Sequence, residues 1–252
     1  MWRTAVVLVV LFTTSLTNAQ NISQWVGQRV ITKYGTPLRF GRQVVYVDTV
    51  FRVYKVDRVK GDWLWLVAGG VSGWVRSSEV VPFDHAVDYY TQEIRANPGS
   101  ASLYLFRGMN WTGKGETDKA IADYNEAIRL DPKDAVAFNN RGNAWWDKKE
   151  YDKAIGDYSE AIRLNPRFAG VFYNRGIAWQ DKKDFDKAIA DYSEAIRLDP
   201  KFAGVFYCRG IAWQDKKEFD KAIADYNEAI RLDPTFALAF NNRGNTWSAK
   251  KR

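Results

Sequence analysis

The two residue types that most often supply nucleophilic or metal chemistry occur once each among the 252 residues, as His85 and Cys208. A Ser-His-Asp or Cys-His arrangement needs a His beside the nucleophile, whereas these two residues fall in separate predicted helices. One His and one Cys also provide neither a disulfide nor a zinc site within one chain. The 30 Asp and Glu residues leave carboxylate-only catalysis as the remaining catalytic alternative. We therefore predict a non-catalytic protein without a metal or a cofactor.

The first 19 residues have the pattern of an export signal. Arg3 precedes an uninterrupted apolar run at residues 5–12, and residues 17–19 supply small side chains for cleavage. This pattern predicts cleavage before Gln20 and a soluble mature protein in the periplasm or outside the cell. The alternative is a retained anchor, although the apolar run is shorter than the ~20 residues that cross a bilayer.

The second half of the chain is an internal repeat with a period of 34 residues. The recurring residues are Pro98, Pro132, Pro166, Pro200 and Pro234, together with Gly108, Gly142, Gly176, Gly210 and Gly244. Within one period, helical spacing relates Phe185, Ala188, Ile189, Tyr192, Ala195 and Ile196. A second apolar segment precedes the turn at residues 181–184, and Pro200 ends the helix that follows the turn. Each period is therefore predicted to be a hairpin of two helices.

This pattern resembles the tetratricopeptide repeat. The residues that carry the resemblance are Gly176, Ala188, Tyr192, Ala195 and Pro200, with Phe172 and Trp179 as large residues of the first helix. Four full copies match, at residues 101–134, 135–168, 169–202 and 203–236. A half repeat at 85–98 precedes them and a final helix at 237–252 follows, so that residues 84–252 are predicted to form a solenoid of about ten helices.

Residues 24–83 differ from the repeats because they are rich in Val, Trp, Tyr and Phe. Short apolar runs at residues 51–56 and 63–67, separated by a turn, indicate a small all-β barrel. The segments that resemble bacterial Src-homology-3-like domains are 61–66, 69–70 and 73–75. That resemblance implies a module for targeting or for binding cell-wall peptides. The predicted fold is thus multidomain, with a small β-barrel followed by an all-α solenoid.

The tetratricopeptide resemblance implies that a ligand would lie on the concave face formed by the first helices. The residues expected on this face are Leu105, Met109, Asn139, Asn143, Trp146, Asp147, Tyr173, Ile177, Gln180, Asp181, Tyr207, Ile211, Gln214, Asp215, Asn241 and Asn245. Residues 168–201 and 202–235 differ at four of 34 positions, none of them on this face, so two equivalent subsites are expected. These aromatic, amide and carboxylate groups suit an extended ligand with apolar or basic features. The alternative is a recent duplication without a binding role.

An Arg precedes each of the recurring glycines, at Arg107, Arg141, Arg175, Arg209 and Arg243. Some family members hold a carboxylate terminus with a clamp of Lys and Asn side chains. The arginines could take the place of the lysines in such a clamp. However, Leu105 and Tyr173 occupy positions where such a clamp would have cations. We therefore favour a structural ladder in which the arginines pair with carboxylates of the second helices, such as Asp157 and Asp191.

Basic charge is concentrated in residues 24–83, which contain nine Lys or Arg and four Asp or Glu. Together with the export signal, this favours an anionic wall polymer or a membrane surface over nucleic acid as a ligand of the barrel. The alternative is a solvated basic surface without a partner. The main prediction is an exported adaptor that binds a protein or an extended peptide in the solenoid groove. The alternative is a cell-envelope protein whose barrel binds peptidoglycan or another wall polymer.

Overall fold

The computed structural model describes residues 26–33, 37–40, 43–46, 54–68 and 71–251. The predicted export signal lies outside these residues. The chain divides into two compact units, Met1–His85 and Ala86–Arg252. In the described residues the first unit contains a β-sheet and the second contains α-helices, which is the multidomain fold that the sequence predicted.

The described residues of the first unit form one antiparallel sheet of seven strands in the order β3-β2-β6-β5-β4-β1-β7. The strands are β1 (Arg29–Thr32), β2 (Pro37–Phe40), β3 (Gln43–Tyr46), β4 (Tyr54–Lys60), β5 (Trp63–Ala68), β6 (Val71–Arg76) and β7 (Val80–Pro82). The 3-10 helices Ser77–Glu79 and Phe83–His85 lie on either side of β7. The register between β4 and β5 shifts at Val56 and Arg58, and such an irregularity bends a strand and increases its twist.

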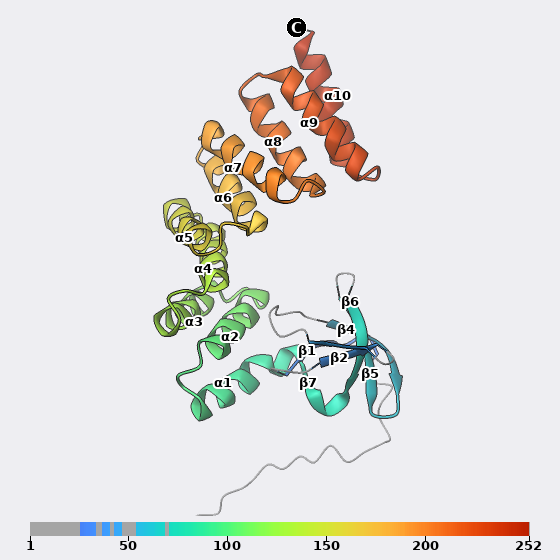
Figure 1. Ribbon diagram of the computed structural model, residues 1–252, viewed down its shortest axis with the longest axis vertical. Helices are drawn as coiled ribbons and strands as arrows, with labels where there is room; N and C mark the ends of the chain where they lie inside the picture. Colours follow the sequence, from blue (N-terminus) through green and yellow to red (C-terminus); the bar gives the residue numbers. More distant parts are fainter. Residues whose placement is uncertain (1–25, 34–36, 41–42, 47–53, 69–70, 252) are drawn as a thin grey trace, which may run out of the picture. The chain divides into compact units, whose positions relative to one another are not determined.

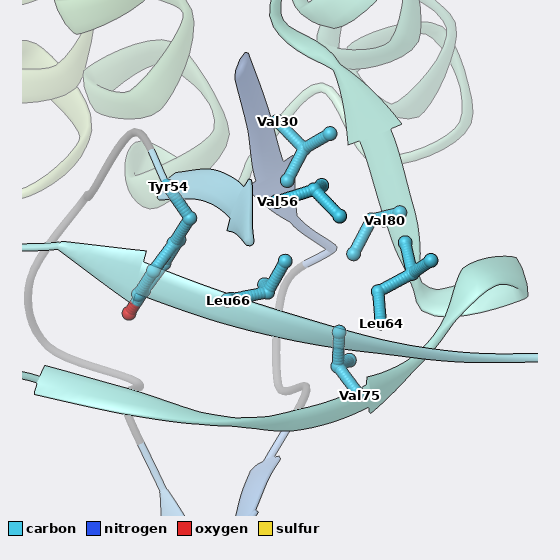
Figure 2. Close-up of a cluster of buried hydrophobic side chains, with 7 residues drawn as sticks. All are labelled: Val30, Tyr54, Val56, Leu64, Leu66, Val75 and Val80. Carbon is cyan, nitrogen blue, oxygen red and sulfur yellow. The ribbon is translucent and has the colours of Figure 1, made fainter. Parts of the chain in front are cut away.

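The main core cluster of this unit is aliphatic, apart from one tyrosine. Figure 2 shows the cluster formed by Val30, Tyr54, Val56, Leu64, Leu66, Val75 and Val80. On β5, Leu64 and Leu66 are fully buried, whereas the alternate residues Trp63 and Trp65 are half-buried. Successive side chains of a strand point to opposite faces, so the two tryptophans lie on the face away from this core. They contact arginines instead, with the Arg58 guanidinium 5.1 Å from the Trp65 ring.

The second unit consists of ten helices in its described residues. They are α1 (Ala86–Ala96), α2 (Ala101–Gly113), α3 (Thr117–Leu130), α4 (Ala135–Asp147), α5 (Tyr151–Leu164), α6 (Ala169–Asp181), α7 (Phe185–Leu198), α8 (Ala203–Asp215), α9 (Phe219–Leu232) and α10 (Ala237–Lys250). Helices α2 to α9 form four hairpins, each packed on the next, and α1 and α10 are single helices at the two ends (Figure 1). Within the described residues, no helix combines the length and the apolar character needed to cross a membrane.

Local sequence signals explain where the helices turn. In the third hairpin, the Asp184 side chain accepts a hydrogen bond from the Lys187 backbone N–H and so caps the start of α7. The residue that ends each hairpin turn is in the left-handed region of φ; these residues are Gly115, Lys149, Lys183 and Lys217. Glycine adopts this conformation without steric cost. At the third turn, the backbone N–H groups of Lys183 and Asp184 donate to the carbonyls of Gln180 and Trp179, and these bonds close the end of α6 with Lys183 in this conformation.

A close contact between a glycine and a tyrosine joins the two helices of each hairpin. In the third hairpin, a Cβ on Gly176 of α6 would lie 2.6 Å from Cε1 of Tyr192 on α7. The same contact recurs between Gly108 and Tyr124, Gly142 and Tyr158, and Gly210 and Tyr226. All four tyrosines are at most 2% exposed. Because glycine has no Cβ, the tyrosine ring can pack directly against the backbone of the facing helix.

A paired charge accompanies each of these contacts. The Arg175 guanidinium donates to both carboxylate oxygens of Asp191, with N–O distances of 2.7 and 2.8 Å. It also donates to the Ser159 hydroxyl of the preceding hairpin at 3.0 Å. Equivalent bidentate pairs join Arg107 to Asp123, Arg141 to Asp157, and Arg209 to Asp225. The predicted ladder between these arginines and the carboxylates of the second helices is confirmed.

The glycine contact predicts opposite effects for two alanine substitutions. Gly176→Ala should lower the free energy of unfolding by about 1–3 kcal/mol, because the added methyl group meets the Tyr192 ring. Gly156→Ala, in α5, should raise that free energy by about 0.5–1 kcal/mol, because a Cβ there has no neighbour within 4 Å and alanine favours helix. Urea unfolding of both variants measures the difference. Equal stability of the two variants would contradict the packing described here.

The buried tyrosines predict a loss of stability at alkaline pH. Burial raises the pKa of Tyr124 to about 12, and it also raises the pKa of Tyr158 and of Tyr192. Above pH ~10 these groups ionise in the unfolded chain and stay protonated in the folded one, so that the free energy of unfolding falls as pH rises. Urea midpoints at increasing pH should show this fall, and Tyr124→Phe should make it shallower. An unchanged slope in that variant would argue against the effect.

Candidate functional site

A cavity of about 250 Å³ lies among α4, α5 and α6. The residues that line it are Asn143, Trp146, Asp147, Tyr158, Asn174 and Ile177. Four of these, Asn143, Trp146, Asp147 and Ile177, were predicted from the sequence for the concave face. Tyr158 was not predicted because it lies on α5, the second helix of its hairpin. Asn174 was not predicted because its neighbour on α6, Tyr173, was assigned to the concave face.

Hydrogen bonds between amide side chains hold one wall of the cavity. Asn174 Nδ2 donates to Asn139 Oδ1 at 3.0 Å and to Asn143 Oδ1 at 3.2 Å. The Tyr158 hydroxyl donates to the same Asn143 oxygen at 2.8 Å. These bonds link α4, α5 and α6, so the wall is fixed by contacts between two successive hairpins.

The lining of the cavity also includes an aromatic ring, Trp146, and a carboxylate, Asp147. Trp146 Nε1 donates to Asp181 Oδ2 at 2.7 Å, which fixes the indole while 37% of the residue stays exposed. Asp147 follows it in the chain and has no ion pair among the described residues. Partial burial raises the pKa of Asp147, since loss of hydration disfavours the charged form. A cation bound beside this carboxylate would compensate the lost hydration.

Several other predicted residues are committed to the protein interior. Leu105 is 7% exposed and packs with Ile121 and Tyr124 in the core between α2 and α3. Met109 packs against the same cluster. Asn139 is 8% exposed and takes part in the amide network. Leu105 and Asn139 therefore offer a ligand little surface, whereas Met109 is half-buried.

The two near-identical units place their tyrosines in similar ring contacts. The Tyr173 ring lies 5.1 Å from that of Phe202, and the Tyr207 ring lies 4.9 Å from that of Phe236. The polar partners of their hydroxyls differ, because Tyr207 accepts from Asn242 at 3.0 Å whereas Tyr173 contacts Sγ of Cys208 at 3.8 Å. The two subsites thus match in their apolar walls and differ at the hydroxyl.

The remaining predicted residues complete the row of first helices. Gln180 and Gln214 each accept a hydrogen bond from the tyrosine of their own hairpin, Tyr192 and Tyr226. Asp181, Asp215, Asn241 and Asn245 are exposed, and Ile211 is half-buried. In the described part of the chain, no cluster of three or more His, Cys, Asp or Glu side chains could hold a metal ion. Burial raises the pKa of the Cys208 thiol, which disfavours the nucleophilic thiolate.

Family models identify the repeats. A model described as "Tetratricopeptide repeat" matches residues 135–168 and 169–202. A second model, described as "TPR repeat", matches residues 113–148 and 212–249. No curated protein matches the chain.

Solved structures with the same fold cover most of the helical unit. The structure of MamA is similar, with a TM-score of 0.58 and 27% identity, over 62% of this chain and 91% of that one. YrrB, described as "a TPR protein with an unusual peptide-binding site", has a TM-score of 0.58 and 24% identity, over 66% and 85% of the two chains. TTC0263, a thermophilic TPR protein of Thermus thermophilus, has a TM-score of 0.53 and 17% identity, over 66% and 90%.

The amide network predicts unequal costs for two asparagine substitutions. Asn174→Ala should lower the free energy of unfolding by about 1–2 kcal/mol, because it removes the donor to the nearly buried Asn139 amide oxygen. Asn245→Ala, at an exposed position of α10, should change it by less than about 0.5 kcal/mol. Thermal and urea unfolding of the two variants test this difference. Equal costs would mean that the network contributes nothing to stability.

Proposed function

We propose that this chain, which contains tetratricopeptide repeats, is a non-catalytic adaptor that binds an extended protein segment along its first helices. The observation that carries the proposal is the cavity lined by Asn143, Trp146, Asp147 and Ile177. It combines an exposed aromatic ring, amide groups and a carboxylate without an ion pair among the described residues. Such a combination of apolar surface and a few polar groups is typical of a binding site.

The chemistry of the cavity favours a ligand segment with a basic side chain. Its lining residues include one acidic group, Asp147, and none that is basic. A Lys or Arg of the ligand would pair with Asp147 and pack its aliphatic stem against Trp146 and Ile177. The asparagine wall would hydrogen-bond an extended ligand backbone, which exposes both donors and acceptors.

The similar structures are consistent with this proposal. YrrB is described as having a peptide-binding site, and the cavity found here provides a place for such a ligand. A clamp for a carboxylate terminus receives no support, because Leu105 is buried and Arg141 and Arg175 are engaged by Asp157 and Asp191.

We further propose that the protein is exported and that its first unit is a Src-homology-3-like barrel, as the sequence predicted. One observation favours the alternative function of wall-polymer binding by this unit. Arg58 and Arg76 lie over the rings of Trp65 and Trp63, at 5.1 and 5.4 Å, on the face of β5 away from the core. Basic groups beside half-exposed aromatic rings suit an anionic polymer that contains sugar.

The cavity proposal predicts which substitutions abolish peptide binding. On an array of extended nonapeptides with Lys, Arg, Leu or Glu at the centre, the protein should bind the Lys and Arg peptides. Asp147→Asn and Trp146→Ala should each weaken this binding by roughly tenfold, which corresponds to about 1.4 kcal/mol. Binding should also weaken at acid pH, where Asp147 becomes protonated at a pKa above the usual Asp range.

The matched control is Glu194→Gln, which removes a carboxylate of α7 that does not line the cavity. This variant should bind like the parent protein. Equal affinity of the Glu and Lys peptides, or unchanged binding by the two cavity variants, would contradict the proposal. Retention of purified wall polymer alone would favour the first unit as the binding module.

A further inference from the structure

The first helix of each of the last three hairpins ends on an aspartate, and these aspartates have different partners. They are Asp147 of α4, Asp181 of α6 and Asp215 of α8, at equivalent positions of the repeat. Asp147 lines the cavity. Asp181 accepts a hydrogen bond from Trp146 Nε1 at 2.7 Å. Of the three carboxylates, the one in the cavity is the one whose charge a ligand would meet first.

A lysine of the preceding turn acts on Asp215. Burial raises the pKa of Asp215, and the positive charge of Lys183 acts against that rise. Lys183 belongs to the turn between α6 and α7, so the lysine of one hairpin compensates a carboxylate of the next. At Asp147 the equivalent turn residue is Gly115, which has no side chain to supply a charge. Burial raises the pKa of Asp147 without an opposing cation among the described residues.

The backbone at this turn position favours glycine. The angle φ is 76° at Gly115, 61° at Lys149, which is the equivalent residue at Asp181, and 62° at Lys183. Glycine adopts this left-handed conformation freely, whereas the Cβ of a lysine opposes it. Residues in such conformations are often found where a function requires their side chains. Compensation of a neighbouring carboxylate is the gain that the structure shows for Lys183.

The other titratable groups that act on Asp147 are neutral. They are the hydroxyls of Tyr124 on α3 and Tyr158 on α5, and burial raises the pKa of both. The Tyr158 hydroxyl donates to Asn143, and the Tyr124 hydroxyl is hydrogen-bonded to Thr112 at 2.9 Å. A tyrosine hydroxyl that is protonated and hydrogen-bonded offers no positive charge. Within the described part of the chain, the negative charge of Asp147 is thus available to a ligand.

We propose that Gly115 is a specificity-determining residue of the cavity. Because Gly115 places no cation near Asp147, the ligand itself supplies the positive charge at this unit. At the next two units the preceding turn presents Lys149 or Lys183, so the ligand has uncharged side chains there. This inference rests on the proposed function and deepens it. The ligand is an extended segment with its basic residue at the second full repeat and uncharged residues along the third and fourth.

Two substitutions at Gly115 separate the effect of charge from that of the backbone. Gly115→Lys introduces the residue that the following turns hold at a similar φ, and Gly115→Asn introduces a neutral residue that tolerates the same conformation. On the array of nonapeptides, Gly115→Lys should weaken binding of the Lys and Arg peptides by about three- to tenfold. Gly115→Asn should bind them like the parent protein.

Carboxyl NMR titration of the full chain gives a second measurement that needs no ligand. Gly115→Lys should lower the pKa of Asp147 relative to the parent, whereas Gly115→Asn should leave it unchanged. Lys183→Gly should raise the pKa of Asp215, because it removes the opposing charge. A role of Gly115 in the shape of the turn alone would change none of these values.

Equal binding of the Lys peptide by Gly115→Lys and Gly115→Asn would overturn the inference, and so would an Asp147 pKa that Gly115→Lys does not lower. A parent protein that binds the Lys, Leu and Glu peptides alike, or none of them, would overturn the proposed function and this inference together. A parent that prefers the Lys peptide but is insensitive to Gly115→Lys would overturn this inference alone.

Discussion

The close approach of a tyrosine ring to a glycine sets the geometry of the solenoid. Because a single methyl group does not fit between Gly176 and Tyr192, the two helices of the hairpin must be spaced by that ring. The fully buried alanines of the second helix, such as Ala188 and Ala195, allow the same close packing toward the neighbouring helices. The Arg175 guanidinium beside this contact then joins the hairpin to the preceding one through Ser159. Gly176, which sets the spacing within the unit, and Arg175, which bonds to the preceding unit, are thus adjacent residues of α6.

The two sets of ion pairs in the solenoid differ in what they contribute. The carboxylate of Asp191 is 9% exposed and bonded on both oxygens, so loss of Arg175 would leave a buried charge unpaired. Lys182 pairs with Asp152 of the preceding unit, but that carboxylate is 85% exposed. Exposed pairs of this kind stabilise a protein by less than about 1 kcal/mol. The arginine pairs therefore stabilise each hairpin more than the lysine pairs stabilise the junction between units.

The helices were predictable from the sequence because packing and local signals agree in every unit, as at Ala188, Tyr192 and Pro200. The cavity was only partly predictable. Asn174 bonds to Asn139 and Asn143, which lie 35 and 31 positions earlier. Aligning the repeats shows which positions are equivalent, but it does not show which side chains of neighbouring units are in contact. Leu105 and Tyr173 share a repeat position, yet Leu105 is buried against Ile121 and Tyr173 is half-buried. Exposure at one position thus depends on side-chain size and on the neighbouring unit.

The surfaces that successive units present to one another are almost interchangeable. Arg175 bonds to Ser159, and Arg209 bonds to Ser193, at the same distance of 3.0 Å. Inserting or removing a segment of 34 residues between two such hairpins would bring together two surfaces that already match. The gain or loss of a whole unit therefore requires no compensating substitution elsewhere. The length of the array, and with it the number of Tyr173-type positions, is open to change during evolution in steps of one unit.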